Sequence, residues 1–386
     1  MNTDKINILI VCKWPLGGIR TYLKYYYSYF PKEKYSITLL AKPSHEGESV
    51  ISDMKKIGVK VLWANSFWKF DIFFLQIFAL LFKGRFDIIH SQGYLSAANT
   101  AFAKLFFKTY HVLTIHGMLE EKYFSGFFGP YKKKLLKLLL KKVDTFHGVG
   151  EDILNHFLAI YPVFKTDKFN RIIIRNGIHP QKFLEKLQIE PNKLKEKCSI
   201  DPDSNLFGFF GRFMPVKGFD YIINAVELLI QKDNNLKIQV ICFGSGDYKA
   251  EYMADVSNKN LNEYFKFMPF QSDITSMIKI CDAVLMPSLS EAYPMQSSEI
   301  LCSGVPLIAS HCMGLKEATK DTPAIQIPVK NSSALAEAML KVINNPAIKD
   351  EFLQYQHKAA KRFDVGPLAR ELVRYFDEIC LNLRKR

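Results

Sequence analysis

Short apolar runs alternate with longer amphipathic stretches along almost the whole chain, and this alternation most limits the possible fold. The first series of runs is "INILIVC", "SITLLAK", "VKVLWA", "FDIIHSQ", "HVLTIHG", "TFHGVG" and "NRIIIRNG". After a polar stretch near residues 185–205, the pattern resumes with "LFGFFGR", "KIQVICFG", "YFKFMPF", "AVLMPS" and "PLIAS". Uniformly apolar runs are typical of parallel strands, because helices cover both faces of such a sheet. The two series predict an α/β protein with two doubly wound domains.

The break between the two series predicts the domain boundaries. With 386 residues, the chain is long enough for two or three domains of ordinary size. We expect a first Rossmann-like domain over residues 1–177 and a second over residues 178–365. Residues 366–386 have the pattern of one amphipathic helix that ends the chain.

The composition excludes several classes of protein. Hydrophobic residues make up 48% and charged residues 23% of the chain, which predicts a packed globular protein rather than a disordered one. The 7 cysteines are scattered without a CxxC, so neither a disulfide framework nor a zinc cluster is expected. The most apolar stretch, near residues 71–86, is shorter than the ~20 residues that span a bilayer and is expected to be a buried helix. No signal peptide is evident, and we expect a cytoplasmic protein.

The charge of the chain is unevenly placed. The net charge is +14, of which +13 falls in residues 1–180 and +1 in residues 181–386. This asymmetry predicts an anionic partner for the first half, such as nucleic acid, an acidic membrane or a phosphate-bearing lipid. The basic stretch "YKKKLLKLLLKK" from Tyr131 has leucines on one face in helical projection. It either lies on an acidic membrane or is an ordinary domain helix whose lysines face water.

The segment "SLSEAYPMQSSEI" carries two acids, Glu291 and Glu299, with a proline between them. Eight helical steps of ~1.5 Å would separate their backbones by ~12 Å. A retaining glycosidase holds its two carboxyl groups ~5.5 Å apart, and an inverting one ~6.5–9.5 Å apart. The spacing therefore argues against a hydrolytic pair and favours two separate contacts on one extended ligand.

Two segments place suitable residues where open α/β sheets bind ligands. In "WPLGGIRTYL", Gly17 and Gly18 follow a predicted strand and open a helix, whose N-terminus would favour an anion; a plain turn is the alternative. In "FGRFMPVKGFDYIINAV", Arg212 and Lys217 follow the end of a strand. They would either clamp a phosphate or lie in a solvated loop.

Other candidates lie at the ends of further predicted strands. His90 and His116 both fall at strand ends of the first domain, and two histidines there favour a ligand site over a structural role. Gly244 lies in the glycine-rich turn "VICFGSGDY". The "DPD" at residues 201–203 has the form of a metal-binding DxD, but a turn in a polar linker is the better interpretation.

Together these segments resemble the retaining glycosyltransferases of family 4, which have the GT-B fold. The resemblance covers most of the chain and is densest from Phe207 to Ser310. It is carried by a glycine loop, an Asn-Gly-x-Asp linker, a Gly-Arg…Lys-Gly segment, a Gly-x-Gly turn and a Glu-x7-Glu signature, which correspond to "WPLGGI", "IRNGIHPQKF", "FGRFMPVKGFDYIINAVELL", "VICFGSGDY" and "PSLSEAYPMQSSEILCSGVPLIAS". Each motif is weak alone, but their order within two β/α series identifies the chain as a member of the family.

The resemblance implies a fold and a set of roles. Two Rossmann-like domains would face each other across a cleft, with the C-terminal helix packing back on the first domain. The second domain would hold a nucleotide-sugar donor and the first would present the acceptor. Glu291 would lie by the donor sugar, Glu299 would bind the ribose hydroxyls, and His116 would lie beside the reaction centre. The other donor contacts would come from Gly18, Arg212, Lys217, Gly244, Tyr293, Pro294 and Met295.

The resemblance also implies the class of reaction. A front-face substitution would need no carboxylate nucleophile, no metal and no cofactor. Pro294 is expected to begin a helix whose N-terminus meets the diphosphate. The acceptor would be a glycan or a lipid-linked sugar in surface polysaccharide or glycolipid synthesis, and the basic half would contact the inner face of the membrane.

Some positions depart from the family pattern. His179 and Gly117 stand where Asp is common, and Gly150 stands where Ser is common. Pro269 replaces a glycine near the nucleobase, so a UDP-sugar is favoured over a GDP-sugar without being fixed. None of these changes removes a charged donor contact.

Two other functions remain as alternatives. Another GT-B enzyme, such as a phosphorylase, would share the fold, although no lysine motif for a pyridoxal cofactor is evident. A non-enzymatic nucleic-acid-binding protein would explain the basic half, but no aromatic–basic recognition motif is visible and we expect no nucleic-acid partner. A dehydrogenase is disfavoured because GxGxxG is absent.

Overall fold

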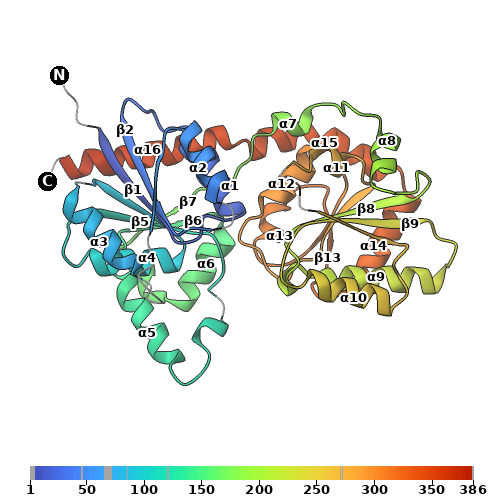
Figure 1. The fold of residues 1–386 in the computed structure, drawn as a ribbon, viewed down its shortest axis with the longest axis horizontal. Coiled ribbons are helices and arrows are strands. Elements are labelled where there is room, and N and C mark those ends of the chain that lie inside the picture. Colours follow the sequence, from blue (N-terminus) through green and yellow to red (C-terminus); the bar gives the residue numbers. More distant parts are fainter. Residues whose placement is uncertain are drawn as a thin grey trace. The chain divides into compact units, whose positions relative to one another are not determined.

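The structure is a computed structural model that describes residues 5–44, 47–64, 72–84, 86–119, 121–269, 271 and 273–384. Its contacts divide the chain into two units, the first made of residues 1–177 with 365–386 and the second of residues 178–364. In each unit, helices cover both faces of one sheet (Figure 1). Residues 1–4 and 385–386, which we assigned to the first domain and the last helix, lie outside the described residues.

The first unit contains a 7-stranded sheet in the order β3-β2-β1-β4-β5-β6-β7. Every neighbouring pair is parallel, and this order is that of a Rossmann fold extended by one strand. Each apolar run of the first series forms a strand, so this part of the prediction is confirmed. The strands are β1 Ile6–Cys12, β2 Tyr35–Ala41, β3 Lys60–Trp63, β4 Ile88–Gln92, β5 Tyr110–Ile115, β6 Thr145–Gly148 and β7 Asn170–Ile173.

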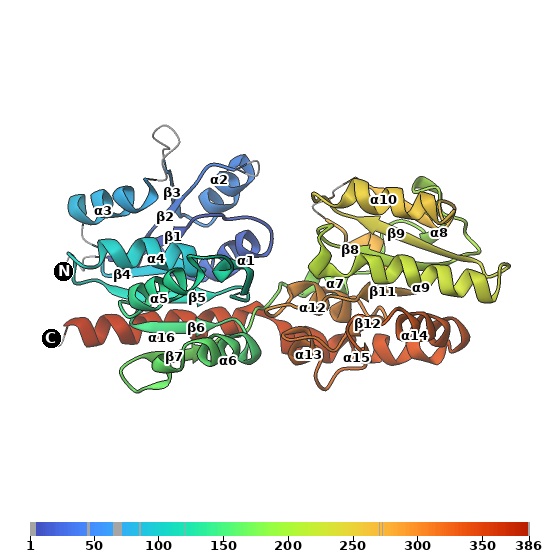
Figure 2. The same ribbon diagram turned by 90° about the horizontal axis from the view of Figure 1, so that it is seen from below.

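Two hydrophobic cores cover the two faces of this sheet. Alternate residues of β1, among them Ile8 and Ile10, pack with α1, α2 and the C-terminal α16, whereas Leu9 and Val11 pack with α3. Figure 2 shows α3, α4 and α5 in front of the sheet and α16 running along it. The helices are α1 Gly18–Tyr27, α2 Gly47–Lys56, α3 Phe73–Lys83, α4 Tyr94–Ala103, α5 Gly129–Leu140, α6 Glu151–Ile160 and α16 Val365–Arg384, with 3-10 turns at Glu121–Phe124 and Pro162–Lys165.

The C-terminal helix α16 packs on the first unit, as expected. Phe376 contacts Phe30 with 5.5 Å between ring centroids, and the Tyr375 hydroxyl lies 2.7 Å from that of Thr145. Lys34 forms an ion pair of 2.7 Å with Asp377. These contacts make the end of the chain part of the first core, although it follows the second unit in sequence.

The second unit contains a 6-stranded sheet in the order β10-β9-β8-β11-β12-β13, again parallel throughout. The predicted runs form the first five strands of this unit, whereas no strand was predicted at β13, which has 3 residues. The strands are β8 Asn205–Phe210, β9 Ile238–Phe243, β10 Phe265–Met268, β11 Ala283–Met286, β12 Leu307–Ser310 and β13 Ile325–Ile327.

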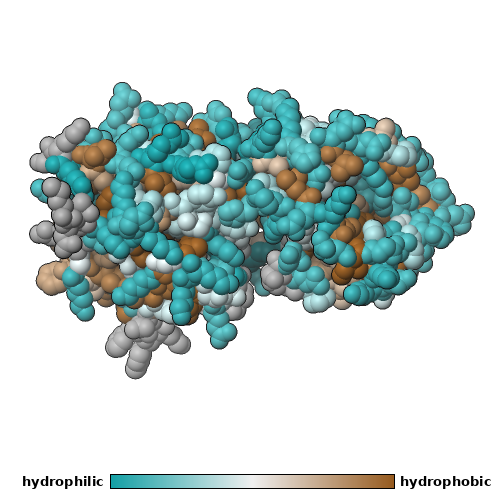
Figure 3. Space-filling model, turned by 90° about the horizontal axis from the view of Figure 1, so that it is seen from above, coloured by the Kyte–Doolittle hydropathy of each residue, from teal (hydrophilic) through white to brown (hydrophobic). Residues whose placement is uncertain are grey.

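The helices of the second unit form two layers. Helices α9, α10 and α14 pack together, and α7, α12 and α15 form another packed group. Hydrophilic side chains dominate the face seen in Figure 3, and hydrophobic ones lie in small patches among them. The helices are α7 Gln181–Leu184, α8 Pro191–Lys197, α9 Phe219–Lys232, α10 Lys249–Asn258, α11 Thr275–Lys279, α12 Met295–Cys302, α13 Leu315–Ala318, α14 Ser332–Asn344 and α15 Ala347–Phe363, with a 3-10 turn at Pro215–Lys217.

Each sheet has a point where the strand order reverses, between β1 and β4 in the first unit and between β8 and β11 in the second. Open α/β sheets bind ligands outside the carboxyl ends of the strands at this point, because the following loops diverge there. Ligand-binding residues are therefore expected at these two edges.

A buried polar network crosses the first sheet. The His90 ring nitrogens lie within hydrogen-bonding distance of the hydroxyls of Tyr27 and Thr114, and the Thr114 hydroxyl also lies 2.9 Å from Nδ1 of His147. Both histidines are fully buried. The expectation that His90 helps form a ligand site is therefore wrong, because both of its ring nitrogens have partners in the buried core of the first unit.

Acidification should destabilise the first unit. Burial holds the pKa of His90 and His111 well below the usual value and that of His147 at about 4. In the unfolded chain these histidines take up protons near pH ~6.5. The stabilisation is therefore complete above that pH and is lost as pH falls towards the folded pKa, by about 1.4 kcal/mol per pH unit for each histidine.

Tryptophan fluorescence in urea can measure this loss, because all 3 tryptophans lie between residues 14 and 68 and report on the first unit. The urea concentration at the unfolding midpoint should be lower at pH ~5.5 than at pH ~7.5, and His147→Gln should make this difference smaller. His357→Gln, at an exposed position of α15, is the control that should leave it unchanged. Equal midpoints at the two pH values would contradict the assignment.

Candidate functional site

Most of the predicted site residues lie at the carboxyl edge of the second sheet. Arg212 and Lys217 follow β8, Gly244 follows β9, and the segment from Glu291 to Glu299 follows β11. Parallel pairing brings these strand ends to one edge, as the sequence predicted. Gly18 and His116 lie in the first unit, after β1 and β5.

A close backbone approach joins the loops after β8 and β11. Gly218 has a left-handed φ of 68°, and a Cβ there would lie 2.2 Å from the carbonyl oxygen of Pro287. The backbone N–H of Leu289 also donates to the carbonyl of Val216 over 2.8 Å. Only glycine allows this approach, which fixes Lys217 beside the acidic segment.

The carboxylate of Glu291 is held by neighbouring loops. Its Oε1 accepts hydrogen bonds from Lys217 Nζ at 2.7 Å and from the Ser288 hydroxyl at 2.8 Å. Its backbone N–H donates to the Met313 carbonyl over 3.0 Å, and a Cβ on Gly314 would lie 2.3 Å from its carbonyl oxygen. Sequence reasoning selected Glu291 and Lys217 but missed their ion pair and the role of Ser288.

Helix α12 begins one residue later than expected. Pro294 has φ −73° and ψ 125°, so it is the extended N-cap residue, and Met295 is the first helical residue. The first turn contains no acidic residue, and no side chain caps it. Such an N-terminus presents unpaired backbone N–H groups and favours an anion. Tyr293, which precedes the N-cap, is buried.

Glu299 lies in the second turn of α12 and is half-buried. Burial raises its pKa; Lys182 opposes this shift and Asp273 adds to it. Within the described residues, no hydrogen bond or ion pair engages its carboxylate. A desolvated carboxylate gains most from a ligand that donates hydrogen bonds to it.

Arg212 and Gly244 lie on two loops that touch each other. A Cβ on Gly244 would lie 1.8 Å from the carbonyl oxygen of Gly211, so the turn after β9 packs directly on the backbone before Arg212. The N–H of Phe213 donates to the Ser245 carbonyl over 2.9 Å and extends this contact. The Arg212 side chain itself is exposed, and the described residues offer it no ion-pair partner.

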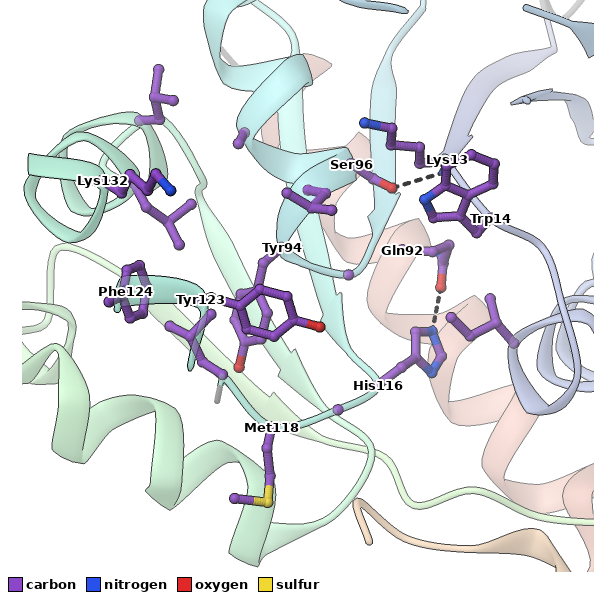
Figure 4. A pocket seen from close by; sticks show the side chains of 18 of the residues that line it. Lys13, Trp14, Gln92, Tyr94, Ser96, His116, Met118, Tyr123, Phe124 and Lys132 are labelled. Carbon is purple, nitrogen blue, oxygen red and sulfur yellow. Dashed lines mark hydrogen bonds between the residues drawn. The ribbon is translucent and has the colours of Figure 1, made fainter. Parts of the chain in front are cut away.

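In the first unit, His116 is held as a neutral imidazole. Its Nε2 lies 2.7 Å from Oε1 of Gln92 (Figure 4). The Tyr22 ring meets the imidazole edge-on, with 4.8 Å between the ring centroids. Burial lowers its pKa to about 3. Gln92 was not predicted, because nothing in "HSQG" shows which way its side chain points.

His116 lines a cavity of about 500 Å³ that the sequence did not predict. Figure 4 shows His116 and Gln92 on one side of it and Lys132 of α5 on the other. Its wall is mostly apolar and includes Tyr94, Met118, Tyr123, Phe124, Leu136 and Leu139. Cavities of ~300–1,000 Å³ are the usual size for small-molecule sites.

The glycine loop after β1 has the predicted form. Gly17 is the N-cap residue of α1 with a left-handed φ of 53°, and a Cβ there would meet nothing within 4 Å. Glycine is therefore favoured here by the backbone conformation and not by crowding. Gly18, the first residue of α1, is exposed.

The "DPD" segment forms a turn, as predicted, because the Asp201 carboxylate accepts a hydrogen bond of 2.9 Å from the N–H of Asp203. Among the residues that the structure describes, no group of three or more His, Cys, Asp or Glu side chains is arranged to hold a metal ion. The helices in the described part of the chain are too short or too polar to cross a bilayer.

Family models match both halves of the chain. The model of glycosyltransferase family 4 matches residues 16–182, and that of glycosyl transferases group 1 matches residues 191–363. The chain is a family-4 glycosyltransferase. The family predicted from the motifs is thus confirmed.

Curated relatives are similar over much of the chain. The UDP-Gal:alpha-D-GlcNAc-diphosphoundecaprenol alpha-1,3-galactosyltransferase of Escherichia coli is 24% identical and covers 94% of both chains. The O-antigen biosynthesis glycosyltransferase WclY of Escherichia coli is 27% identical and covers 66% of this chain and 69% of its own. This glycosyltransferase therefore has one relative named for a diphosphoundecaprenol-linked sugar and another named for O-antigen biosynthesis.

Solved structures share the fold. Anabaena HepE in complex with UDP-glucose superposes with a TM-score of 0.82 at 17% identity, covering 97% of this chain and 100% of its own. WaaG, a glycosyltransferase involved in lipopolysaccharide biosynthesis, gives 0.73 at 13% identity, covering 95% and 98%. These likenesses confirm the predicted GT-B fold with two Rossmann-like domains.

Gly244→Ala should destabilise the second unit of this glycosyltransferase. The added methyl group would collide with the Gly211 carbonyl, and shifting that backbone should lower the free energy of unfolding by about 2 kcal/mol or more. Urea unfolding followed by circular dichroism measures the effect. Gly211→Ala is the control, because its Cβ would meet only ordinary contacts of 3.5 Å. Equal effects of the two substitutions would show that the close approach is unimportant.

Proposed function

We propose that this glycosyltransferase moves a sugar, with retention of configuration, from a UDP-sugar to a glycan or lipid-linked acceptor in surface polysaccharide or glycolipid synthesis. The observation that carries the donor assignment is the half-buried carboxylate of Glu299, which has no described partner. It lies one turn beyond the uncapped N-terminus of α12. An acceptor of hydroxyl groups next to an anion site suits the ribose and diphosphate of a nucleotide.

In this proposal, each predicted donor-binding residue of the second unit has a specific role. Glu299 accepts hydrogen bonds from the ribose hydroxyls, and the diphosphate lies at the N-terminus of α12, where Pro294 and Met295 begin the helix. Arg212 contributes a bidentate cation, and Lys217 a point charge. Gly244 lets the turn after β9 approach closely, and Tyr293 supports the acidic segment. The roles predicted for Gly18 and His116 belong to the first unit and remain predictions.

The main catalytic effect would be stabilisation of the departing diphosphate. The bond from the anomeric carbon to the diphosphate oxygen breaks, and the acceptor oxygen bonds to the same face of the sugar. The leaving phosphate takes the acceptor proton. Negative charge grows on the diphosphate during this step, so Arg212, Lys217 and the helix N-terminus act most strongly in the transition state. Glu291, by the sugar, balances the positive charge that develops on the ring, and no metal is required.

Glu299→Ala should weaken UDP binding ten- to a hundredfold, because charge-assisted hydrogen bonds of ~1.5–3 kcal/mol are lost. Calorimetry with UDP in EDTA measures this, and UDP should bind without a metal. Glu351→Ala removes the same charge from an exposed position of α15 and should leave binding unchanged. Unchanged affinity in Glu299→Ala would exclude the ribose role, and strict dependence of binding and transfer on a divalent ion would exclude the metal-free mechanism.

We also propose that the first unit docks on an anionic membrane. Exposed aromatic and aliphatic residues lie at the start of α5 and along it, where Phe127 is 85%, Phe128 65% and Leu138 60% exposed. Exposed lysines lie beside them, including Lys133 and Lys134. We call this region the α5 surface and define it as residues 127–138. The predicted leucine face is only partly present, since other leucines of α5 turn inward.

Charge reversal on the α5 surface should abolish binding to anionic vesicles. Each lysine near an anionic surface contributes ~1 kcal/mol, so Lys133/Lys134/Lys137→Glu should prevent co-sedimentation at low salt. Wild-type binding should also weaken at high salt. Lys186/Lys193/Lys197→Glu carries the same charge change in the second unit and should sediment normally. Equal binding of neutral and anionic vesicles, or full binding by the α5 variant, would contradict the proposal.

A further inference from the structure

The cavity beside His116 has an unusual lining for a site that handles sugars. Sugar hydroxyls need many hydrogen-bonding partners, yet most of the wall consists of the apolar side chains described above. Ala98 of α4 and Leu119 add further apolar surface. A wall of this kind gains most by burying hydrocarbon.

Positive charge collects around this apolar wall. Lys13, in the loop after β1, and Lys132, on α5, line the cavity from different parts of the first unit. The Nζ atoms of Lys13 and Lys42 lie 6.0 and 5.6 Å from the centroid of the Trp14 ring, which also lines the cavity. Several cations from separate elements next to an apolar wall suit a ligand with an anionic head and a hydrocarbon tail.

The cavity is continuous with the α5 surface, because residues of that surface also line it. Leu135 lines the cavity and is also 56% exposed on α5, next to the exposed Tyr131 and Leu138. Leu136 and Leu139, on the inner side of the same helix, lie in the cavity wall. A hydrocarbon chain of a ligand that begins in the cavity can therefore leave it along α5, towards the membrane on which this surface is proposed to dock.

We propose that this cavity binds the first isoprene units of a prenyl diphosphate that carries the acceptor sugar, with the diphosphate near Lys13, Lys42 and Lys132. This proposal rests on the proposed function and specifies its acceptor. A single hydrocarbon chain attached directly to a diphosphate matches one apolar cavity of about 500 Å³ bordered by cations. A diacyl phospholipid would bring two chains to the same opening. The name of the Escherichia coli relative contains a compound of the same class, a sugar on diphosphoundecaprenol.

The emission of Trp14 gives a direct measure of binding. Trp63 and Trp68 are replaced by Phe, so that the fluorescence comes from the residue that lines the cavity. Farnesyl diphosphate should change this emission saturably. Inorganic diphosphate, which lacks the chain, and farnesol, which lacks the charge, should each bind at least tenfold more weakly.

A substitution that fills the cavity separates specific binding from general attraction. Ala98→Phe places a ring in the space for the chain and should weaken farnesyl diphosphate binding tenfold or more. Its affinity for UDP in the second unit should not change. Asn99→Phe adds a similar ring at the next position of α4, which does not line the cavity, and should bind farnesyl diphosphate normally.

Each contrary result would overturn the proposal in a different way. No saturable change, or equal binding by Ala98→Phe, would show that the chain does not occupy the cavity. Equal binding of inorganic diphosphate or farnesol would show that charge or hydrocarbon alone determines binding. Equal binding of the monoacyl lipid lysophosphatidate would exclude selectivity for isoprenoids. If the wild-type protein bound farnesyl diphosphate but not UDP, the donor proposal would be contradicted and the cavity assignment would stand.

Discussion

Parallel pairing of every strand is the constraint on which both candidate sites depend. Parallel strands place all their carboxyl ends at one edge of a sheet, so residues far apart in sequence follow one another along that edge. In the second unit, this edge brings Lys217, after β8, to Glu291, after β11. The approach of Gly218 to the Pro287 carbonyl then fixes the two loops against each other. The charged groups are thus positioned by backbone contacts before any ligand is bound.

The same edge places two carboxylates in different environments. Glu291 is already paired with Lys217 and hydrogen-bonded to Ser288, whereas Glu299 has no described partner and a raised pKa. Two glutamates in one short segment are therefore suited to different contacts. A paired acid tolerates a changing charge nearby, because its counterion can shift towards a new anion. An unpaired and partly desolvated acid attracts hydroxyl donors.

The sequence was sufficient for features that depend on local pattern. Uniform apolar runs located the longer strands, because burial on both faces leaves no room for polar residues, and glycine and proline marked the loops that follow them. Strand β13, with 3 residues, is too short for such a signal. The helix at Pro294 was placed one residue early, because residue type does not determine ψ, which is 125° there.

Features that depend on packing between distant segments could not be predicted. His90 was misassigned because its partners, Tyr27 and Thr114, come from other elements of the first unit. The cavity beside His116 was missed for the same reason, since the loop after β1, α4, α5 and the segment after β5 all contribute to it. The ion pair of Lys217 joins residues 74 positions apart, and only the fold shows that they meet.

The size of the cavity has a consequence for the range of carriers that the enzyme could use. A volume of about 500 Å³ accommodates only the beginning of a long hydrocarbon chain. With an isoprenoid bound as proposed, the protein would recognise the carrier near its head and make no contact that reports its total length. Long and short carriers bearing the same sugar would then compete as equals, and a change in the cell's carrier length would leave this glycosylation step unaffected.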